Sequence, residues 1–195
     1  MTTHTVEAAA AADEAAVFAI LTLAFSADPA ARWTWPDPKI YLEAFPGFAK
    51  AFGGAAFGRG SAHRIGSAGA ALWLPPGVAP DGAALGALMA STADPATAAD
   101  GQQVMQQMAS YHPHEPHWYL PLIGIDPAHQ GKGLGCALLR HVTDICDHDG
   151  VLAYLESSNP RNIPLYERHG FEILGAIQAG RSPTITPMLR KPRRR

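Results

Sequence analysis

The sequence has little charge of either sign and no long hydrophobic run. Only 16% of its residues are charged and the formal net charge is −2, so the composition gives no electrostatic reason to expect nucleic acid or a membrane surface as a partner. No stretch of eighteen apolar residues occurs, and Asp13 and Glu14 interrupt the alanine-rich start. Because it predicts neither a membrane span nor a cleaved leader, the sequence favours a cytoplasmic protein.

Cysteine is also scarce. The two cysteines, Cys136 and Cys146, fall ten residues apart on one predicted helix, which corresponds to a rise of about 15 Å. That separation is too large for a disulfide, so both thiols are expected to be reduced.

Hydrophobic residues are plentiful and make up 47% of the chain, which suffices for one substantial core. No internal repeat or low-complexity linker divides the sequence, so we expect one domain spanning residues 1–195. The cationic run at residues 190–195 is expected to be a disordered basic tail.

Apolar periodicity and turn residues predict alternating strands and helices. Strands are expected at residues 3–9, 63–66, 70–74, 118–125, 151–156, 171–176 and 184–189. Helices are expected at residues 13–25, 40–52, 133–146 and 162–169, with two more between 81 and 110 that Asp94-Pro95 separates. Residues 26–39 are expected to form a loop, because three prolines interrupt any helix there.

Glycine is concentrated in one turn, where an apolar run from Leu122 passes into an amphipathic helix. Gly131, Gly133 and Gly135 carry no side chains that would keep an anion away, so backbone N–H groups and the helix N-terminus can converge on a pyrophosphate. The spacing is not that of a P-loop, because Lys132 is followed by glycine rather than a hydroxyl residue. Nor is it a dinucleotide fingerprint, because Cys136 stands where the third glycine belongs.

Two segments carry a resemblance to a known family. The hexapeptide Gln130-Gly-Lys-Gly-Leu-Gly135 resembles the acetyl-coenzyme A loop of the GNAT N-acetyltransferase superfamily. The segment from Asn159 to Phe171 resembles the Asn-…-Leu-Tyr-…-Gly-Phe segment of the same superfamily. Within this superfamily, residues 112–171 are most similar to the puromycin N-acetyltransferase group. The similarity lies in His114-Glu-Pro-His-Trp-Tyr-Leu120, in the glycine loop and in Pro160-Arg-Asn-Ile-Pro-Leu-Tyr-Glu-Arg168. Antibiotic specificity does not follow from this match.

The resemblance implies an α+β fold with a central mixed, mostly antiparallel twisted sheet flanked by helices. Two central strands would splay apart to admit acetyl-CoA, the expected co-substrate. The cofactor-binding residues would be Ile123, Gly124 and Ile125 along the pantetheine arm, and Gln130, Gly131, Lys132, Gly133, Leu134, Gly135 and Asn159 elsewhere. Gln130 and Asn159 have an alternative role, which is to shape the turns in which they lie.

The same resemblance singles out Tyr166 as a catalytic acid, since a phenol stays protonated at neutral pH and can donate to a departing thiolate. Glu156, at the end of its predicted strand, is the first candidate for the general base, although it could instead orient the acceptor ammonium or form a structural ion pair. Many superfamily members place a glutamate where Tyr119 stands here. His117 and Glu115 are weaker alternatives, and a water chain is another.

Aromatic residues suggest an acceptor pocket. Trp33 and Trp35 lie in the predicted loop and Trp118 lies near the start of a strand, so these three are the expected substrate-binding residues. No metal site is expected, because His112, His114 and His117 lack an acidic or cysteine partner at helical spacing.

These residues favour an acetyl-CoA-dependent N-acetyltransferase, a monomer or homodimer, acting on the primary amine of a small molecule such as an aminonucleoside-like antibiotic. Two alternatives remain open. A protein or peptide N-acetyltransferase would present an open acidic groove, and an inactive acyl-CoA-binding sensor would keep the loop without turnover.

Overall fold

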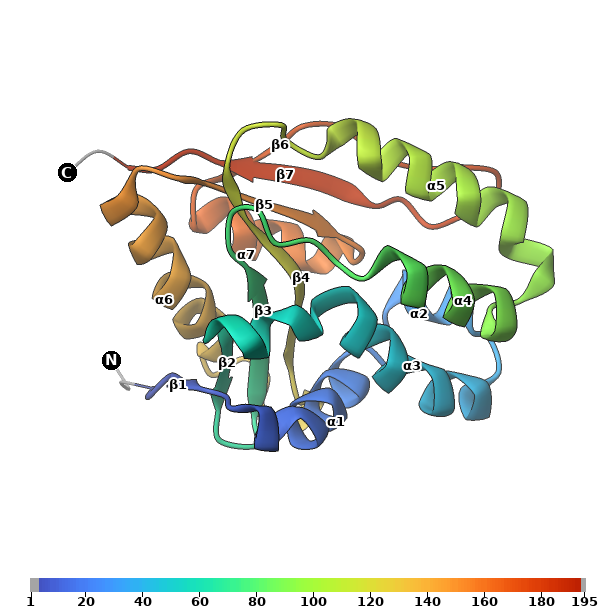
Figure 1. The fold of residues 1–195 in the computed structure, drawn as a ribbon, viewed down its shortest axis with the longest axis horizontal. Helices are drawn as coiled ribbons and strands as arrows, with labels where there is room; N and C mark the ends of the chain where they lie inside the picture. Colours follow the sequence, from blue (N-terminus) through green and yellow to red (C-terminus); the bar gives the residue numbers. More distant parts are fainter. Residues whose placement is uncertain (1–3, 194–195) are drawn as a thin grey trace.

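The structure, a computed structural model, describes residues 4–193 (Figure 1). These residues form a seven-stranded sheet in the order β1-β2-β3-β4-β5-β7-β6. The strands are β1 (Glu7–Ala8), β2 (Ala62–Ile65), β3 (Gly69–Leu74), β4 (His117–Ile125), β5 (Leu152–Ser157), β6 (Phe171–Ile173) and β7 (Thr186–Arg190). Neighbouring strands are antiparallel except β4 and β5, which are parallel. The expected mixed, mostly antiparallel sheet is confirmed.

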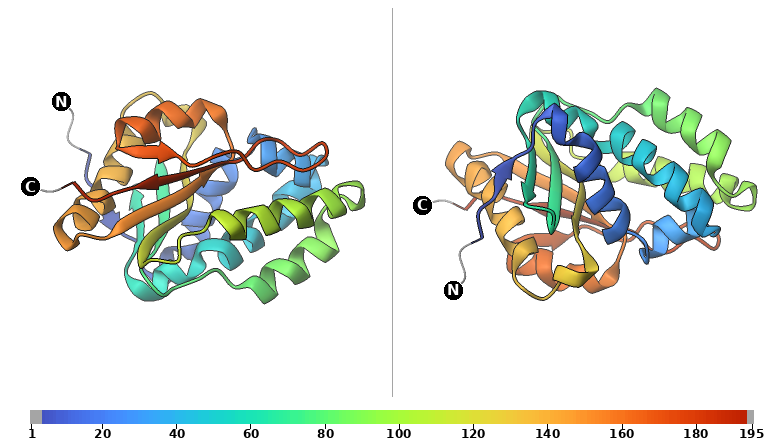
Figure 2. Two further views of the ribbon diagram at one scale, coloured as in Figure 1. Left: turned by 90° about the horizontal axis from the view of Figure 1, so that it is seen from above. Right: turned by 90° about the horizontal axis from the view of Figure 1, so that it is seen from below.

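Helices cover both faces of this sheet (Figures 1 and 2). Helices α1 and α3 pack on β3 and β4 from one face, and α6 packs on strands β2 to β5 from the other. Figure 2 shows α5 running beside the segment that leads into β7. The helices are α1 (Glu14–Ala24), α2 (Pro29–Thr34), α3 (Pro38–Gly53), α4 (Gly82–Thr92), α5 (Ala98–Tyr111), α6 (Leu134–Asp149) and α7 (Ile163–Arg168). Within residues 4–193, no helix combines the length and the apolar character that crossing a membrane requires.

Helix α2 lies where the sequence predicts a loop. The Asp28 carboxylate accepts the backbone N–H groups of Ala30 and Ala31 at 3.0 and 3.1 Å, and Pro29 occupies the first helical turn. Proline is well tolerated there because that N–H has no helical partner. The loop prediction for residues 26–39 was therefore wrong: Pro29 and Pro38 begin helices α2 and α3 instead of preventing them.

The sheet divides most of the core into two halves, and a small third cluster of Val104, Ile177 and Ala179 lies beneath α5. The half beneath α1 and α3 holds a cluster of aromatic rings, and Tyr41 in it donates a hydrogen bond to the Thr22 carbonyl at 2.6 Å. Helix α1 comes so close to β4 that a Cβ on Gly124 would lie 2.5 Å from the Cβ of Ala24. Glycine at this position is thus required by packing, since any side chain would push α1 away from the sheet.

The two central strands pair only where they begin. The parallel register of β4 and β5 runs from His117 opposite Leu152 to Tyr119 opposite Tyr154, and no further pairing of the two strands occurs in the described chain. A register shift between β3 and β4 at Leu72 and Leu74 marks a bulge in β4 near Pro121. Bulges bend a strand and interrupt pairing, and this one lies where β4 and β5 begin to separate.

The described chain end departs from the expected disordered tail at Arg190 and again at Arg193, whose backbone N–H donates to the Asp147 carboxylate at 2.6 Å. Arg190 is the last residue of β7, only 2% exposed, and its guanidinium donates two hydrogen bonds to the Asp147 carboxylate at 2.8 and 2.7 Å. This pair joins β7 to α6, so Arg190 is structural. Residues 194 and 195 of the predicted tail lie outside the described residues. The two cysteines lie on α6 as free thiols, as expected, and burial raises the pKa of Cys146 to about 12.

Candidate active site

The glycine loop joins β4 to α6 and has the backbone form expected of an anion cradle. Gly131 and Gly133 adopt φ angles of +75° and +82°, which disfavour any residue with a side chain, and α6 begins at the next residue, Leu134. A Cβ on Gly131 would meet no atom within 4 Å, so the space in front of this backbone is open. The loop therefore fits a phosphate group held by N–H groups and the start of α6.

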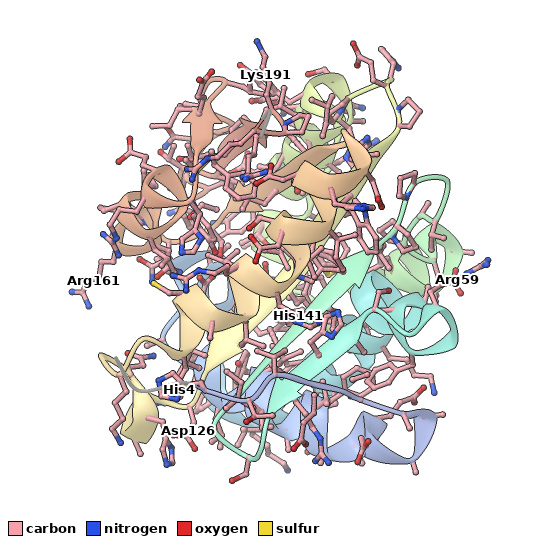
Figure 3. The ribbon with its side chains drawn as sticks, turned by 90° about the vertical axis from the view of Figure 1, so that its left-hand side faces the viewer. His4, Arg59, Asp126, His141, Arg161 and Lys191 are labelled. Atoms are coloured by element: carbon pink, nitrogen blue, oxygen red, sulfur yellow. The ribbon has the colours of Figure 1, made fainter. Side chains whose placement is uncertain are left out.

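The N-terminal segment lies against this loop. Figure 3 shows His4 and Asp126 on the same side of the molecule, at the end of α6 where the loop lies. The His4 ring donates a hydrogen bond from Nε2 to the Lys132 carbonyl at 2.8 Å. Nothing in the sequence pattern pointed to His4, because residues 4 and 132 come together only through pairing of β1 with the sheet edge.

The side chains of Gln130 and Asn159 both make local hydrogen bonds. Gln130 donates from Nε2 to the Ile125 carbonyl at 3.2 Å, and the Asn159 side chain accepts the Arg161 N–H at 3.1 Å. Each side chain thus performs the turn-shaping role that the sequence left open as the alternative. The backbone of residues 123–125 lies on the part of β4 that β5 does not pair, as the splayed-strand expectation requires.

Tyr166 lies on α7 in the core half beneath α6 and is 6% exposed. Burial, with a smaller contribution from the negative charge of Asp28, raises the pKa of its phenol. Its hydroxyl consequently remains a hydrogen-bond donor throughout the neutral pH range.

Asp28, which the sequence placed only in the expected loop of residues 26–39, is a further buried acid near the splay. Its carboxylate is the N-cap of α2 and accepts the Ser158 hydroxyl at 2.7 Å. Burial raises the pKa of Asp28 despite these hydrogen bonds. The contact joins the α1–α2 connection to the end of β5, and the Asp-Pro pair at a helix start is the signal that could have identified it.

Glu156 lies on the opposite face of the sheet from α6. The alternation of β5 places Ala153 and Leu155 in the core half beneath α6, and Tyr154 in the half beneath α1 and α3. The Glu156 side chain is 4% exposed, and its carboxylate lies 3.9 Å from Nδ1 of His112. Burial and the Glu156 charge raise the pKa of both neighbouring phenols, Tyr119 and Tyr154. The carboxylate thus projects from β5 beside Tyr119 of β4.

A cavity of about 390 Å³ opens beside Glu156. Apolar side chains supply much of its wall, and the polar groups in it are two histidines, a phenol and one carboxylate. The residues that define it are Phe52, Met105, Met108, His112, Tyr119 and Glu156, together with Pro80, Ala109, Pro113 and His114. The sequence did not identify α5 as a wall of the site, because the helix reaches this place only through its packing beside the strand ends.

The three tryptophans that the sequence predicted to bind the acceptor do not line the cavity at Glu156. Trp35 is 2% exposed in the aromatic core, where its indole N–H donates to the Thr92 hydroxyl at 3.0 Å. Trp33 lines a second cavity of about 270 Å³ with Asp94 and Arg181. Trp118 packs in the core half beneath α6, on the face opposite the cavity at Glu156. The structure therefore brings none of them to Glu156.

Side chains of the types that bind metal ions form no cluster in the described chain, residues 4–193. Among residues 4–193, no group of three or more histidine, cysteine, aspartate or glutamate side chains is arranged to hold a metal ion.

A sequence profile of the acetyltransferase (GNAT) family matches residues 39–171, more than half of the chain. The chain belongs to the GNAT family. The predicted family is confirmed, and the expected enzyme class, a GNAT-type acyltransferase, is the class that this family describes. The match includes both the glycine loop and the segment from Asn159 to Phe171, but it does not narrow the family to the puromycin N-acetyltransferase group. Membership implies acetyl-CoA as the co-substrate.

Individual GNAT relatives match only in part. An uncharacterized N-acetyltransferase of Schizosaccharomyces pombe is 38% identical over 78 residues, which are 38% of this chain and 32% of that protein. A mycothiol acetyltransferase of Mycolicibacterium gilvum is 39% identical over 61 residues, covering 27% of this chain and 20% of that protein. The chain therefore matches about a third or less of the length of these curated relatives.

One solved structure is similar over its whole length. The structure described as histone acetyltransferase HPA2 and related acetyltransferase from Corynebacterium glutamicum is 26% identical to this chain, with a TM-score of 0.66. The alignment covers 100% of this chain and 99% of that one. The GNAT fold is thereby supported independently of the two motifs.

Proposed function

We propose that this GNAT protein is an acetyl-CoA-dependent N-acetyltransferase that transfers the acetyl group directly to a primary amine of a small molecule. The observation that carries the proposal is the position of Glu156. Its nearly buried carboxylate faces a cavity on one side of the sheet, beside the place where β4 and β5 part, while the glycine loop lies at the other end of β4.

Glu156 is the proposed general base. An aliphatic amine is an ammonium ion at neutral pH and must lose a proton before its nitrogen can attack a thioester. A carboxylate in a largely apolar wall attracts the ammonium and can accept that proton. The neighbouring hydroxyl groups of Tyr119 and Tyr154 stay protonated because their pKa values are raised, so they supply donors rather than competing bases.

Tyr166 is the proposed proton donor to the leaving thiolate. Its phenol is buried on α7 with a raised pKa, so the O–H is retained at neutral pH to stabilise the thiolate as the carbon–sulfur bond breaks. Asp28 and Ser158 then serve as positioning residues, since their hydrogen bond joins the α1–α2 connection to the strand end beside the splay.

The cavity favours a compact amine with an apolar or aromatic body. Phe52, Met105 and Met108 provide apolar contact area, and Glu156 is the single carboxylate in the wall. A peptide-binding groove would need several acidic groups along an extended surface. An aminonucleoside-like amine, which the sequence resemblance to the puromycin N-acetyltransferase group suggested, is the first acceptor class to test.

The test is thiol release from acetyl-CoA across a panel of amines that contains puromycin, arylalkylamines, polyamines, aminoglycosides and peptide N-termini, with acetyl-CoA binding measured in parallel. We expect acceptor-dependent release with a small amine. Preference for peptide N-termini would replace the proposal with a protein N-acetyltransferase. Tight binding of acetyl-CoA without thiol release in the presence of any amine would favour the inactive acyl-CoA-binding sensor.

A further inference from the structure

Two histidines connect Glu156 to the protein surface. His112 caps the C-terminus of α5, and His117 is the first residue of β4. Nδ1 of His112 lies 3.9 Å from the Glu156 carboxylate, and Nε2 of His112 lies 3.0 Å from Nε2 of His117. The other nitrogen of His117, Nδ1, lies 2.8 Å from the Glu115 carbonyl oxygen.

These contacts determine which ring nitrogens carry protons. A carbonyl oxygen only accepts hydrogen bonds, so Nδ1 of His117 is the protonated nitrogen and donates to Glu115. The Nε2 of neutral His117 then holds a lone pair, and His112 must donate its Nε2–H to it. Neutral His112 is left with an unprotonated Nδ1, which is the nitrogen that faces Glu156.

We infer that His112 is a proton-relay residue that takes the acceptor's proton from Glu156 and passes it to solvent, and that His117 is a positioning residue that fixes the His112 tautomer. The inference rests on the proposed function. It deepens that function by naming the route by which Glu156 is reset for the next turnover.

The proton balance is complete at each step. The acceptor ammonium gives one proton to the Glu156 carboxylate, and its freed lone pair forms the new carbon–nitrogen bond as the carbon–sulfur bond of acetyl-CoA breaks. The departing thiolate takes the Tyr166 proton, and the second proton that the nitrogen loses restores the Tyr166 phenol. The resulting carboxylic acid gives that proton to Nδ1 of His112, which becomes an imidazolium. The imidazolium then loses a proton to water.

Protonation of His112 breaks none of its contacts. The imidazolium still donates from Nε2 to His117, it gains an attraction to Glu156, and it lies at the C-terminus of α5, where the helix dipole favours a positive charge. The His112 side chain is 37% exposed, so water can reach it. The 3.9 Å separation from Glu156 exceeds a direct hydrogen bond, and one water or a small rotation of either side chain closes it.

His117 differs from His112 in its suitability to carry charge. Protonation of its Nε2 would place two N–H groups against each other, and burial lowers the pKa of this ring. The charged and titratable groups facing the pair are Glu115, Glu156, Tyr119 and Tyr154, with His114 in the same cavity wall and Tyr111 near Tyr154. His117 thus stays a neutral acceptor that holds the relay in one tautomer.

The test compares His112→Gln with wild type in acceptor-dependent thiol release at low and high buffer concentration. Glutamine keeps a polar side chain that cannot carry the proton. We expect kcat of the variant to fall roughly tenfold or more at low buffer, with the acceptor KM nearly unchanged, and to recover when imidazole or concentrated buffer is added. Wild-type kcat should be independent of buffer concentration. His148→Gln, which removes an 82% exposed histidine on α6, is the matched control and should behave as wild type.

Three results would overturn the relay alone: an unchanged kcat in His112→Gln, a loss that neither imidazole nor buffer repairs, or a rise in KM without a change in kcat. Imidazole rescue cannot arise from misfolding, so a partly unstable variant still gives a decision. A wild-type protein that acetylates no amine would instead overturn the proposed function, and the relay with it.

Discussion

Burial of polar side chains gives the candidate site its character at the scale of single residues. Tyr119, Tyr154 and Tyr166 are all nearly inaccessible to solvent and have raised phenol pKa values, so their hydroxyl groups stay protonated at neutral pH. Glu156 supplies a negative charge between two of them. Tyr166 lies on the α6 side of the sheet, whereas Tyr119, Tyr154 and Glu156 lie on the cavity side.

Replacing Tyr166 by phenylalanine tests the proton-donor role. The change removes one hydroxyl and conserves the ring that packs edge-on against Phe171, so the fold should be retained. We expect kcat to fall about 10- to 100-fold, within or somewhat below the usual range for general acid catalysis, while the acetyl-CoA dissociation constant changes little. Steady-state kinetics and equilibrium binding give the two quantities. Parallel loss of both would assign Tyr166 a packing role.

The sequence predicted part of the site at this scale. Tyr166 and Glu156 were identifiable because they occupy or adjoin a family segment. The neighbours of Glu156 were not identifiable from the sequence. His112 approaches Glu156 only because the parallel pairing of β4 and β5 brings together segments more than forty residues apart. Trp35 could not be told from a pocket residue, because a core and a binding site both favour indole rings.

Local backbone geometry places the two halves of the site at the scale of elements. The bulge in β4 near Pro121 lies where pairing with β5 ends, and the glycine loop turns the same strand directly into α6. The mixed, mostly antiparallel sheet and the glycine-to-helix transition were predictable from the motifs and the family resemblance. Helix α2 was not predicted from the sequence. Its start depends on the Asp28 cap, and Pro29, usually interpreted as a helix breaker, lies in its first turn.

A pair of glycine substitutions on α6 separates cofactor binding from backbone strain. Gly133 before the helix and Gly150 after it have φ angles of +82° and +69°, and alanine at either position should cost about 1–2 kcal/mol of stability. Gly133→Ala should also weaken acetyl-CoA binding at least tenfold, because it reshapes the cradle. Gly150→Ala should leave that affinity unchanged. Thermal unfolding and binding titrations measure both effects, and equal affinities in the two variants would remove the loop from the cofactor site.

The sheet and its two helical layers hold the site at the scale of the whole molecule. The ion pair between Asp147 and Arg190 joins helix α6 to strand β7. Arg190 also donates to the His169 carbonyl, and the Arg193 N–H donates to Asp147. Arg190 is almost fully buried, so its charge depends on Asp147 for compensation. The sequence read Arg190 as part of a basic tail because nothing local to it signals the partner on α6.

Asp147→Asn should destabilise the fold by about 2–3 kcal/mol at neutral pH, because it leaves a buried guanidinium without its counter-charge. The Arg190 hydrogen bonds hold the pKa of Asp147 below its usual value. The carboxylate's contribution is therefore complete above the unfolded-state pKa of about 4 and is lost as the pH falls through the lowered folded-state value. Urea unfolding at pH 7 and below pH 4 should show the difference from wild type shrinking in acid. Asp144→Asn, on the exposed side of α6, is the control, and a loss equal to that of Asp147→Asn would contradict the role of the pair.

The central claim is that Glu156 accepts the proton of an amine bound in the adjacent cavity. The most direct measurement is kcat for acceptor-dependent thiol release by wild type and Glu156→Gln, with Glu43→Gln on the exposed face of α3 as the control. We predict a loss of about 10²- to 10⁴-fold for Glu156→Gln, with acetyl-CoA binding preserved and the control unaffected. Wild-type turnover in Glu156→Gln would contradict the account and move the base elsewhere.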